Sequence, residues 1–401
     1  MPPKPVRRVF TPIGEFLRDE AAGGIFLLVA AIAALVWINA PFGDSYEDFW
    51  DNTLTIGIGS FSITEDLRHW VNDALMTVFF FVVGLEIKRE LVCGELNDPK
   101  TAGLPVIAAV GGMVVPAAIY FALNAGGAGA DGWGIPMATD IAFAVGVLTV
   151  LRSRVPGGLK LFLLTLAIVD DIGAILIIAI FYSEGISGEW MAAAIAMVLA
   201  ILLMQFLRIG HPLAYVLPAV LLWLCVFESG IHATIAGVVL GLLTPARPFG
   251  GRQTIEVLEH RLHPFSSFAI VPLFALANAG VVISITALGD TFTGRIGLGV
   301  ILGLVVGKLV GITGAAALAV RLRLGQLPTG VRPFHILGAA ALAGIGFTVS
   351  LFIADLSFSG AQLDDAKLGV LAASVAAGAL GALVLVLRSR RAEPAGPPPP
   401  A

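Results

Sequence analysis

The sequence predicts an all-α polytopic membrane protein with twelve transmembrane helices and cytoplasmic N- and C-termini. Three observations support this fold class: a low share of charged residues, a series of apolar segments of membrane-spanning length, and an unequal distribution of Lys and Arg between the loops. Hydrophobic residues make up 57% of the 401 residues and charged residues 13%, whereas soluble domains average about 25% charged residues. The mean hydropathy of +0.93 also indicates a membrane protein.

Each predicted span is close to the roughly 20 apolar residues that an α-helix needs to cross a bilayer. The longest polar gap, from Pro41 to Glu65, is too short for a separate soluble domain. We therefore predict a twelve-span domain at 23–388, between a cytoplasmic N-terminus at 1–22 and a disordered, proline-rich cytoplasmic tail at 389–401. The predicted spans are 23–41, 69–87, 103–124, 132–151, 161–182, 189–207, 212–227, 230–245, 264–284, 296–320, 333–355 and 367–387.

The orientation of these spans follows from Lys and Arg, which concentrate in cytoplasmic loops. Of the 24 Lys and Arg residues, Arg68, Arg295 and Lys367 fall in outer segments and Lys308 falls within a span, so the other twenty are cytoplasmic. One missed span would destroy this bias. The first apolar stretch has no small-residue cleavage site after it, so we interpret it as a span and not as a signal peptide.

Net charge and cysteine content exclude two further classes of protein. The net charge of −4 and a pI near 5.9 predict no nucleic-acid partner, and the lipid bilayer is the expected surrounding. Cys93 and Cys225 fall on opposite sides of the membrane in this topology, so we expect no disulfide framework.

The first outer loop contains a predicted β-hairpin at residues 54–63. Apolar residues alternate at Leu54, Ile56 and Ile58 before Gly59-Ser60 and resume with Phe61 and Ile63 after it. A single hairpin is only marginally stable in water. We therefore expect it to pair with a second subunit in a homodimer, and a loose loop is the alternative.

Four charged residues lie near the middle of predicted spans: Asp140 in the fourth, Asp170 and Asp171 in the fifth, and Lys308 in the tenth. A charge at the centre of a membrane helix costs about 2.5–3.5 kcal/mol even on lenient insertion scales, so such groups are functional or paired. A buried Asp–Lys pair that only fixes helix packing is the structural alternative. It leaves two of the three acids without a base, so a cation, a proton or both must complete the charge balance.

The consecutive positions of Asp170 and Asp171 suit ion exchange. Neighbouring residues on a helix point about 100° apart, so one carboxylate can face Lys308 while the other faces a water-filled cavity. Two carboxylates this close do not both ionise readily, so one can exchange a proton for a cation. Carboxylates, hydroxyls, carbonyls and water bind hard cations. No His or Cys lies at mid-depth in these spans, which argues against zinc or copper.

Two of the predicted spans contain helix breakers at their centres. Gly134 and Pro136 precede Thr139-Asp140 in the fourth span, and Gly344 and Gly346 lie in the eleventh. Spans three to five and ten to twelve begin on opposite sides of the membrane, so they can be inverted repeats in which spans four and eleven correspond. Interrupted segments in matching positions indicate the binding site of a transporter.

The motifs "MATDIAFAVGVL", "LAIVDDIGAI", "SGIHATIAGVVLGLL", "LEHRLHPF", "PLFALANAG", "GKLVGI" and "GIGFTVSLFIA" resemble the NhaA family of bacterial Na⁺/H⁺ antiporters. The resemblance runs in order from about Gly23 to Arg388. It implies an inner-membrane secondary transporter that exports Na⁺, and Li⁺ as well, in exchange for H⁺ without a cofactor. If two protons load the two acids for each cation, exchange is electrogenic.

The resemblance also implies roles for the mid-membrane residues. Asp171 is expected to be the main Na⁺ ligand, and Asp170 is expected to take part in proton exchange and to pair with Lys308. Thr139 and Asp140 are expected beside the crossing of spans four and eleven. There Asp140 would balance the helix N-termini and Lys308 the C-termini.

A pH-responsive cluster at the cytoplasmic mouth is also implied by the resemblance. Its expected members are Glu86, Glu90, Glu259, His260 and His263, and an ordinary solvated helix end is the alternative. The chain carries Glu256-Val257 where some family members have a basic pair.

His232 matches another family position linked to pH response. A satisfied histidine near the outer end of a span is the structural alternative for this residue.

Three other functions compete with antiport. An intramembrane aspartyl protease also uses two mid-membrane acids, but its GxGD signature is missing from "IVDD", so we expect no enzyme. A proton-coupled solute symporter needs a larger polar or aromatic pocket than these spans provide. The buried lysine argues against a channel.

Overall fold

The computed structural model describes residues 7–58, 61–151, 155–183, 185–246 and 254–389. The predicted tail at 389–401 lies, except for Ser389, outside the described residues, as does the Gly59-Ser60 turn. The first half of the described chain contains α1 (Arg7–Ile38), α2 (Asp44–Trp50), β1 (Thr53–Ile58), β2 (Phe61–Asp66), α3 (Leu67–His69), η1 (Trp70–Leu75), α4 (Met76–Cys93), η2 (Glu95–Asn97), α5 (Pro99–Asn124), η3 (Ala130–Met137), α6 (Ile141–Val150), α7 (Gly157–Phe181) and α8 (Gly188–Phe206).

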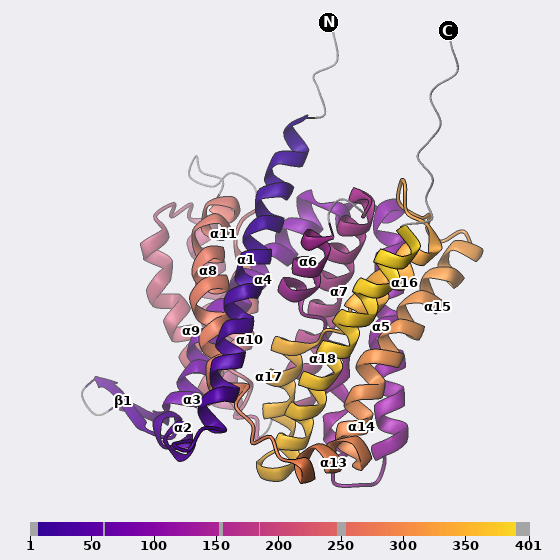
Figure 1. Ribbon diagram of the computed structural model, residues 1–401. Coiled ribbons are helices and arrows are strands. Elements are labelled where there is room, and N and C mark those ends of the chain that lie inside the picture. Colours follow the sequence, from indigo (N-terminus) through magenta and orange to yellow (C-terminus); the bar gives the residue numbers. More distant parts are fainter. Residues whose placement is uncertain (1–6, 59–60, 152–154, 184, 247–253, 390–401) are drawn as a thin grey trace, which may run out of the picture.

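The second half is helical throughout its described elements. These are η5 (Pro212–Tyr215), α9 (Val216–Glu228), α10 (Thr234–Leu243), α11 (Thr254–Phe265), η6 (Ser266–Ile270), α12 (Val271–Asn278), α13 (Ile285–Thr293), α14 (Arg295–Leu302), η7 (Gly303–Gly307), α15 (Lys308–Arg321), α16 (Pro333–Leu342), α17 (Phe347–Ser357) and α18 (Gly360–Ser389). Figure 1 shows that α1 begins and α18 ends at one end of the bundle, whereas β1 lies at the other, which we call the hairpin end.

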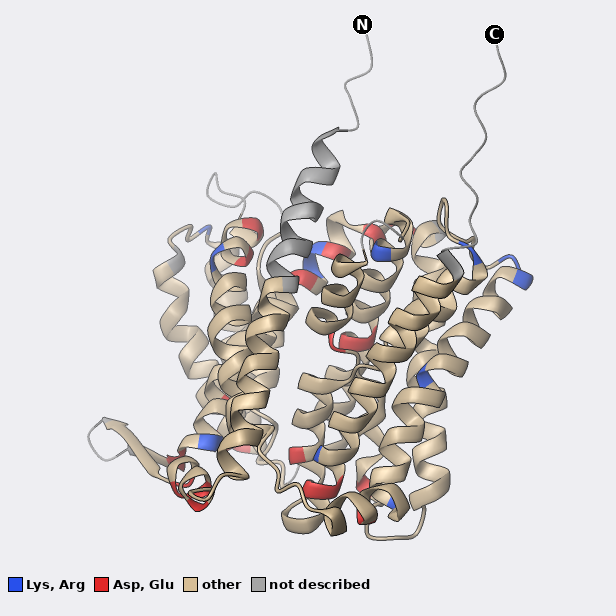
Figure 2. Cartoon of the chain, in the orientation of Figure 1, with Lys and Arg blue, Asp and Glu red and all other residues tan. Residues whose placement is uncertain are grey.

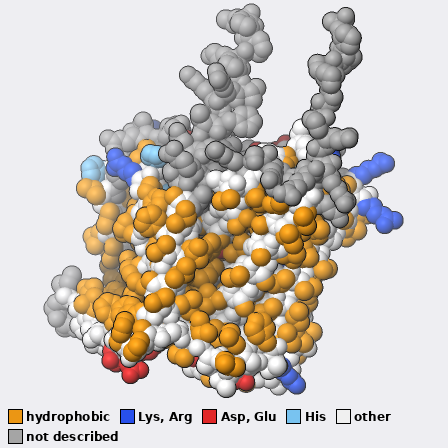
Figure 3. Space-filling view, in the orientation of Figure 1, with side chains coloured by type: hydrophobic (Ala, Val, Ile, Leu, Met, Phe, Trp, Pro, Cys, Tyr) orange, Lys and Arg blue, Asp and Glu red, His pale blue; other side chains and the backbone are white. Residues whose placement is uncertain are grey.

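The lateral surface of the bundle is apolar, as a membrane protein requires. Figure 3 shows hydrophobic side chains over the side of the molecule, with charged side chains at its two ends. In the described chain, seven helices are long and apolar enough to cross a membrane, or eight when the bent pair α16 and α17 counts as one span. Three shorter apolar helices, Ala22–Ile38, Leu213–Glu228 and Thr234–Leu243, lie among them.

Close helix packing depends on glycine where α4 meets α10. A Cβ on Gly237 would lie 2.1 Å from the Thr77 carbonyl oxygen, and one on Gly241 would lie 2.6 Å from the Gly84 carbonyl carbon. In lipid the hydrophobic effect does not drive helices together, so such small residues let backbones approach and gain van der Waals contact.

The predicted hairpin is confirmed, although it is longer than expected. Strands β1 and β2 pair antiparallel from Thr53 opposite Asp66 to Ile58 opposite Phe61. The hydroxyls of Thr55 and Thr64 lie 2.8 Å apart across the pair. The Trp70 indole of η1 donates to a carbonyl oxygen of β1 over 2.9 Å, which ties the hairpin to the bundle.

The ninth predicted span differs from the structure. The sequence predicts 264–284, but the helix runs through α11, η6 and α12, so it begins earlier, at Thr254, and ends at Asn278. Pro264 does not end it because the π-helical turn η6 follows directly and accommodates the lost backbone hydrogen bond. The short helices α2 and α13 were not predicted from the sequence.

Candidate functional site

Two interrupted helices cross at the centre of the bundle: η3 with α6, and α16 with α17. Between their halves the chain is not helical, and the Asp140 N–H donates to the Ile345 carbonyl oxygen over 2.6 Å. The α16–α17 pair is bent by 46°. Glycine permits this close crossing because a Cβ on Gly346 would lie only 3.1 Å from the Ala138 carbonyl oxygen of the other interrupted helix. The structure therefore confirms both interruptions expected from glycine and proline.

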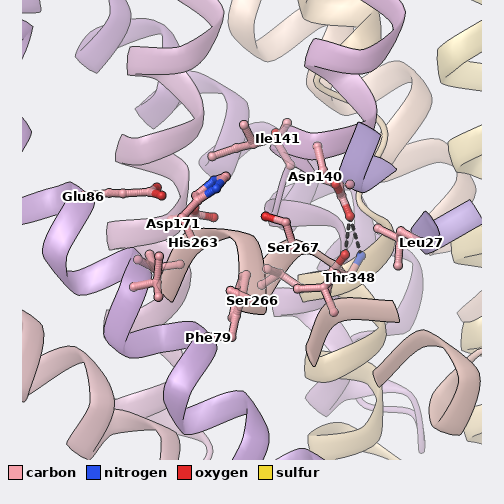
Figure 4. Close-up of a pocket in the computed structure, with 17 residues that line it drawn as sticks. Leu27, Phe79, Glu86, Asp140, Ile141, Asp171, His263, Ser266, Ser267 and Thr348 are labelled. Carbon is pink, nitrogen blue, oxygen red and sulfur yellow. Dashed lines mark hydrogen bonds between the residues drawn. The ribbon is translucent and has the colours of Figure 1, made fainter. Parts of the chain in front are cut away.

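Asp140 is shared by the N-termini of the two half-helices. Its Oδ1 accepts from the Phe143 N–H over 3.1 Å, which caps α6. Its Oδ2 accepts from the Thr348 N–H over 3.0 Å, at the start of α17, and from the Thr348 hydroxyl. Figure 4 shows Asp140 pointing at Thr348. One carboxylate therefore meets the positive ends of two helix dipoles.

Asp170 and Lys308 form a completely buried ion pair. The Lys308 Nζ donates to Asp170 Oδ2 over 2.5 Å and to the Thr139 hydroxyl over 3.0 Å. That hydroxyl also lies 2.7 Å from Asp170 Oδ2 and 2.8 Å from the carbonyl oxygen of Ala343, so the contact of Lys308 with the end of α16 runs through Thr139. Asp170 Oδ1 is buried and has no hydrogen-bond partner among the residues that the structure describes.

Asp171 occupies a different environment one residue later. Within the described part of the chain its carboxylate has no hydrogen-bond or ion-pair partner, and its side chain lines a cavity. Figure 4 shows Glu86 and His263 close to it on the side of the cavity away from Asp140. Because Asp171 has no base of its own, a proton or a cation must neutralise it in the membrane.

The cavity is small and is lined by both polar and apolar side chains. Its volume is about 70 Å³, and its polar lining comprises Glu86, Thr139, Asp140, Asp171, His263, Ser266, Ser267 and Thr348. A water needs about 10–15 Å³ of this volume, so several waters or a partly hydrated ion fit. Pockets for organic ligands measure about 300–1,000 Å³. The size of the cavity thus argues against an organic substrate at Asp171.

The acidic and histidine side chains that line the cavity are not arranged as a metal site. Among the described residues no group of three or more His, Cys, Asp and Glu side chains could hold a metal ion. A cation at Asp171 would therefore be held by one or two carboxylates, hydroxyls and water. Such a site suits a weakly held transported ion better than a structural metal.

The expected cytoplasmic cluster is only partly assembled. Glu86 and His263 line the cavity, and Glu259 is buried with an ion pair to Arg89. Because Arg89 is on α4 and Glu259 is on α11, this ion pair joins the two helices. Arg89 also lies 3.5 Å from Glu90 Oε1. Arg89 was not expected in the cluster, although its place between two glutamates in "GLEIKRE" was a signal.

Burial raises the pKa of the Glu259 carboxyl, and the nearby charges of Arg89 and His263 partly oppose this effect. Glu259 therefore takes up a proton at a higher pH than an exposed glutamate. Protonation would weaken its ion pair with Arg89.

Two histidines with an expected role in the pH response, His260 of the cluster and the separate His232, do not join these residues. The side chain of His260 is exposed, unlike that of His263. His232 precedes α10 and follows α9, whose Trp223 stacks on Trp70 next to the hairpin. His232 is therefore at the hairpin end, far from Glu86.

The sequence matches the family described as Na⁺/H⁺ antiporter 1 over residues 14–385. A protein named Na(+)/H(+) antiporter NhaA 3 from Frankia alni is 44% identical, with 97% of this chain and 93% of the relative covered. An NhaA from Anaeromyxobacter is 46% identical over 95% of this chain and 92% of its own length. NhaA 2 from Clostridium beijerinckii is 43% identical, with 94% of each chain covered.

Proposed function

This chain belongs to the Na⁺/H⁺ antiporter 1 family and exchanges Na⁺ for H⁺ across a membrane, and we propose that Asp171 and Asp170 carry the exchanged ions. The protein is a transporter and not an enzyme, and Na⁺ and H⁺ are its substrates. The observation that supports this site most directly is the Asp171 carboxylate, which faces a small cavity and has no hydrogen-bond or ion-pair partner in the described part of the chain.

The first half of the cycle begins with the cavity open toward Glu86. Na⁺ enters and binds Asp171, and the unpartnered Oδ1 of Asp170 is available as a second ligand. Both acids have released their protons to the cytoplasm by then. Because Na⁺ partly neutralises Asp170, it competes with Lys308 for this carboxylate, and the ion pair loosens when the ion binds.

The second half takes place after the crossing of the interrupted helices moves and exposes the site on the hairpin side. Two protons load Asp170 and Asp171 there and release the cation. Thr139 and Asp140 keep the two interrupted helices together during the movement, and Lys308 balances Asp170 when no cation is bound. Two protons then enter for each exported Na⁺ or Li⁺, which makes the exchange electrogenic.

The proposed setting is the inner membrane of a bacterium, with twelve spans in 23–388, inverted repeats at spans three to five and ten to twelve, and the hairpin end periplasmic. The ninth span, which completes this count of twelve, lies within the helix from Thr254 to Asn278. Leu54 and Ile56 on β1 are 43% and 53% exposed, which favours a homodimer through the hairpin. We also propose that Glu86, Glu90, Glu259 and His263 adjust the response to pH, with smaller parts for His260 and His232.

The test is cation-dependent collapse of a proton gradient in proteoliposomes that contain only this protein. Na⁺ and Li⁺ should collapse an imposed acid-inside gradient, and K⁺ and choline serve as controls. Collapse without any added cation would indicate a proton leak, and collapse only with an organic solute would indicate a symporter. Either result would reject the proposed exchange.

A further inference from the structure

Three buried phenylalanine rings, which we call the aromatic layer, lie on the hairpin side of the cavity. Phe80 and Phe274 flank Phe352, with ring centroids 5.6 and 6.2 Å from it. All three rings are buried, with at most 3% of their surface exposed. A hydrated cation does not pass such a layer, so the path from Asp171 to the hairpin end is closed here.

A polar layer lies beyond the aromatic one. The side-chain amides of Asn72 and Asn278 bond reciprocally, over 3.2 and 2.8 Å, and the Asn72 amide also donates to Asp355 Oδ2 over 2.8 Å. Asn72 and Asn278 are 5% and 0% exposed. We call Asn72, Asn278 and Asp355 the polar clasp.

The same three helical segments build the cavity wall, the aromatic layer and the polar clasp, in that order. Along α17 the order is Thr348, Phe352, Asp355, and at about 1.5 Å per residue Asp355 lies roughly 10 Å beyond the cavity. The other two series are Val271, Phe274 and Asn278 on α12, and Val83, Phe80 and Asn72 on α4 and η1. The clasp is therefore on the line from Asp171 to the hairpin end.

The polar clasp includes a charged residue, Asp355, which a purely structural contact between amides would not need. Asp355 is only half-buried, and the ammonium of the buried Lys367 attracts it. Figure 2 likewise shows acidic and basic residues inside the lower part of the bundle as well as at its ends. Asp355 and Lys367 are thus a second combination of a carboxylate with a buried lysine, after Asp170 and Lys308. An unpaired charge inside the membrane is costly, so the two opposite charges stabilise each other.

The ligand chemistry of the clasp matches that of a hard cation. One carboxylate and two amide carbonyl oxygens are the oxygen ligands that Na⁺ accepts. In the structure the Asn72 amide N–H group occupies the position on Asp355 Oδ2 that a cation would take. Asn72 lies in η1, a π-helical turn, and such turns are frequent at functional sites.

We propose that Asp355 and the side-chain oxygens of Asn72 and Asn278 form a second Na⁺ site on the hairpin side of the aromatic layer, which the exported ion occupies after it leaves Asp171. The Asn72 amide fills this site while the hairpin side is closed. When the three helices separate, the clasp opens and Asp355 becomes available to the ion. This inference rests on the proposed exchange at Asp171.

The experiment compares the KM for Na⁺ measured from the two sides of the membrane in the same variant. Everted membrane vesicles present the opposite end of the bundle to the medium, and right-side-out vesicles present the hairpin end. In Asp355→Asn we expect the KM for Na⁺ added at the hairpin face to rise by about tenfold, the loss of one good ligand, and the KM at the other face to change less than about twofold. Asp355→Glu keeps the charge and should recover part of the affinity.

The control is Asp131→Asn, which removes an exposed carboxylate at the same end without touching the clasp. It tests whether surface charge alone alters local Na⁺ concentration. An unchanged KM at the hairpin face in Asp355→Asn, or equal changes at both faces, would overturn the second site. Failure of the proposed exchange looks different, because Asp171→Asn would then keep normal exchange at both faces.

Discussion

Asp170 and Asp171 are neighbours on α7, yet the structure gives them opposite environments. Asp170 is completely buried against Lys308 and Thr139, whereas Asp171 lines the cavity without a partner among the described residues. The turn of about 100° between consecutive helical residues explains this difference. One acid can therefore hold the bundle together while the other stays accessible to ions.

Replacing Asp171 with Asn should separate transport from folding. The amide keeps the shape of the side chain but removes the charge that attracts the cation, so we expect exchange to fall by about a hundredfold or more, equivalent to about 2.7 kcal/mol. The amount of inserted protein should stay normal, because Asp171 makes no hydrogen bond that the amide would break. Na⁺-driven proton release in everted vesicles measures the effect. Near-normal exchange in this variant would remove Asp171 from the site.

At the scale of helices, the crossing is stabilised by one side chain that caps two of them. The Asp140 carboxylate accepts hydrogen bonds from the N–H of Phe143 in α6 and from the N–H of Thr348 in α17. The ends of two half-helices are thereby tied to a single carboxylate, and a shift of one half-helix moves the other. This arrangement gives the interrupted helices a means to move together, as the exchange cycle requires.

The close contact between α4 and α10 can be tested through its effect on the stability of the protein. In Gly241→Leu the added side chain has no space, because even a Cβ would lie 2.6 Å from Gly84. Overpacking of this kind costs about 1–3 kcal/mol, so we expect a lower Tm in detergent. The matched control is Gly314→Leu, since nothing lies within 4 Å of a Cβ on Gly314. Equal melting temperatures for the two variants would contradict the close packing.

Some elements could be predicted from the sequence because they depend on residues that are close together in the chain. The breaks that follow Gly134 and Pro136 and that include Gly344 and Gly346 come from residues that disfavour helix, and the hairpin comes from strict alternation. The ninth span was predicted to start at 264, but the helix itself begins ten residues earlier, at Thr254, and continues past Pro264 into a π-helical turn. Arg89 was missed as a bridge between α4 and α11, since its partner Glu259 is 170 residues away.

The polar clasp shows the same limit more clearly. Asn72 and Asn278 are 206 residues apart, and Asn72 and Asp355 are 283 apart. Single Asn and Asp residues are common near the ends of spans, so no sequence motif identifies these three as a cluster. Only the packing of η1 against α12 and α17 brings them together, and that packing depends on the whole bundle.

At the scale of the whole molecule, the proposed cycle moves net charge. If two protons enter for each Na⁺ that leaves, one positive charge crosses inward, and a potential of 100 mV contributes about 2.3 kcal/mol. We therefore expect an inside-negative potential, set with K⁺ and valinomycin in proteoliposomes, to accelerate Na⁺ efflux. Vesicles with equal K⁺ on both sides are the control. A flux that ignores the imposed potential would mean that one proton is exchanged for each cation.

The response to pH combines two effects with different signatures. In the proposed cycle protons and Na⁺ compete for Asp170 and Asp171, so we expect acid to suppress exchange and saturating Na⁺ to restore it. A separate gate that depends on Glu259 would not respond to Na⁺. We expect saturating Na⁺ to restore activity only in part at low pH, because both effects operate. Exchange rates measured against Na⁺ concentration at several pH values distinguish them.

The gate can be tested on its own through Glu259. Burial raises the pKa of this carboxyl, so as pH falls it becomes neutral earlier than an exposed glutamate and the ion pair with Arg89 weakens. Glu259→Gln imitates the neutral form at every pH, and we expect it to move the activation curve to higher pH. Adding Glu86→Gln and Glu90→Gln should extend the shift. Glu256→Gln is the matched control, since Glu256 is exposed on the same helix. If the triple variant reproduces the wild-type curves at every Na⁺ concentration, the cluster is an ordinary solvated helix end and competition at Asp170 and Asp171 alone accounts for the pH response.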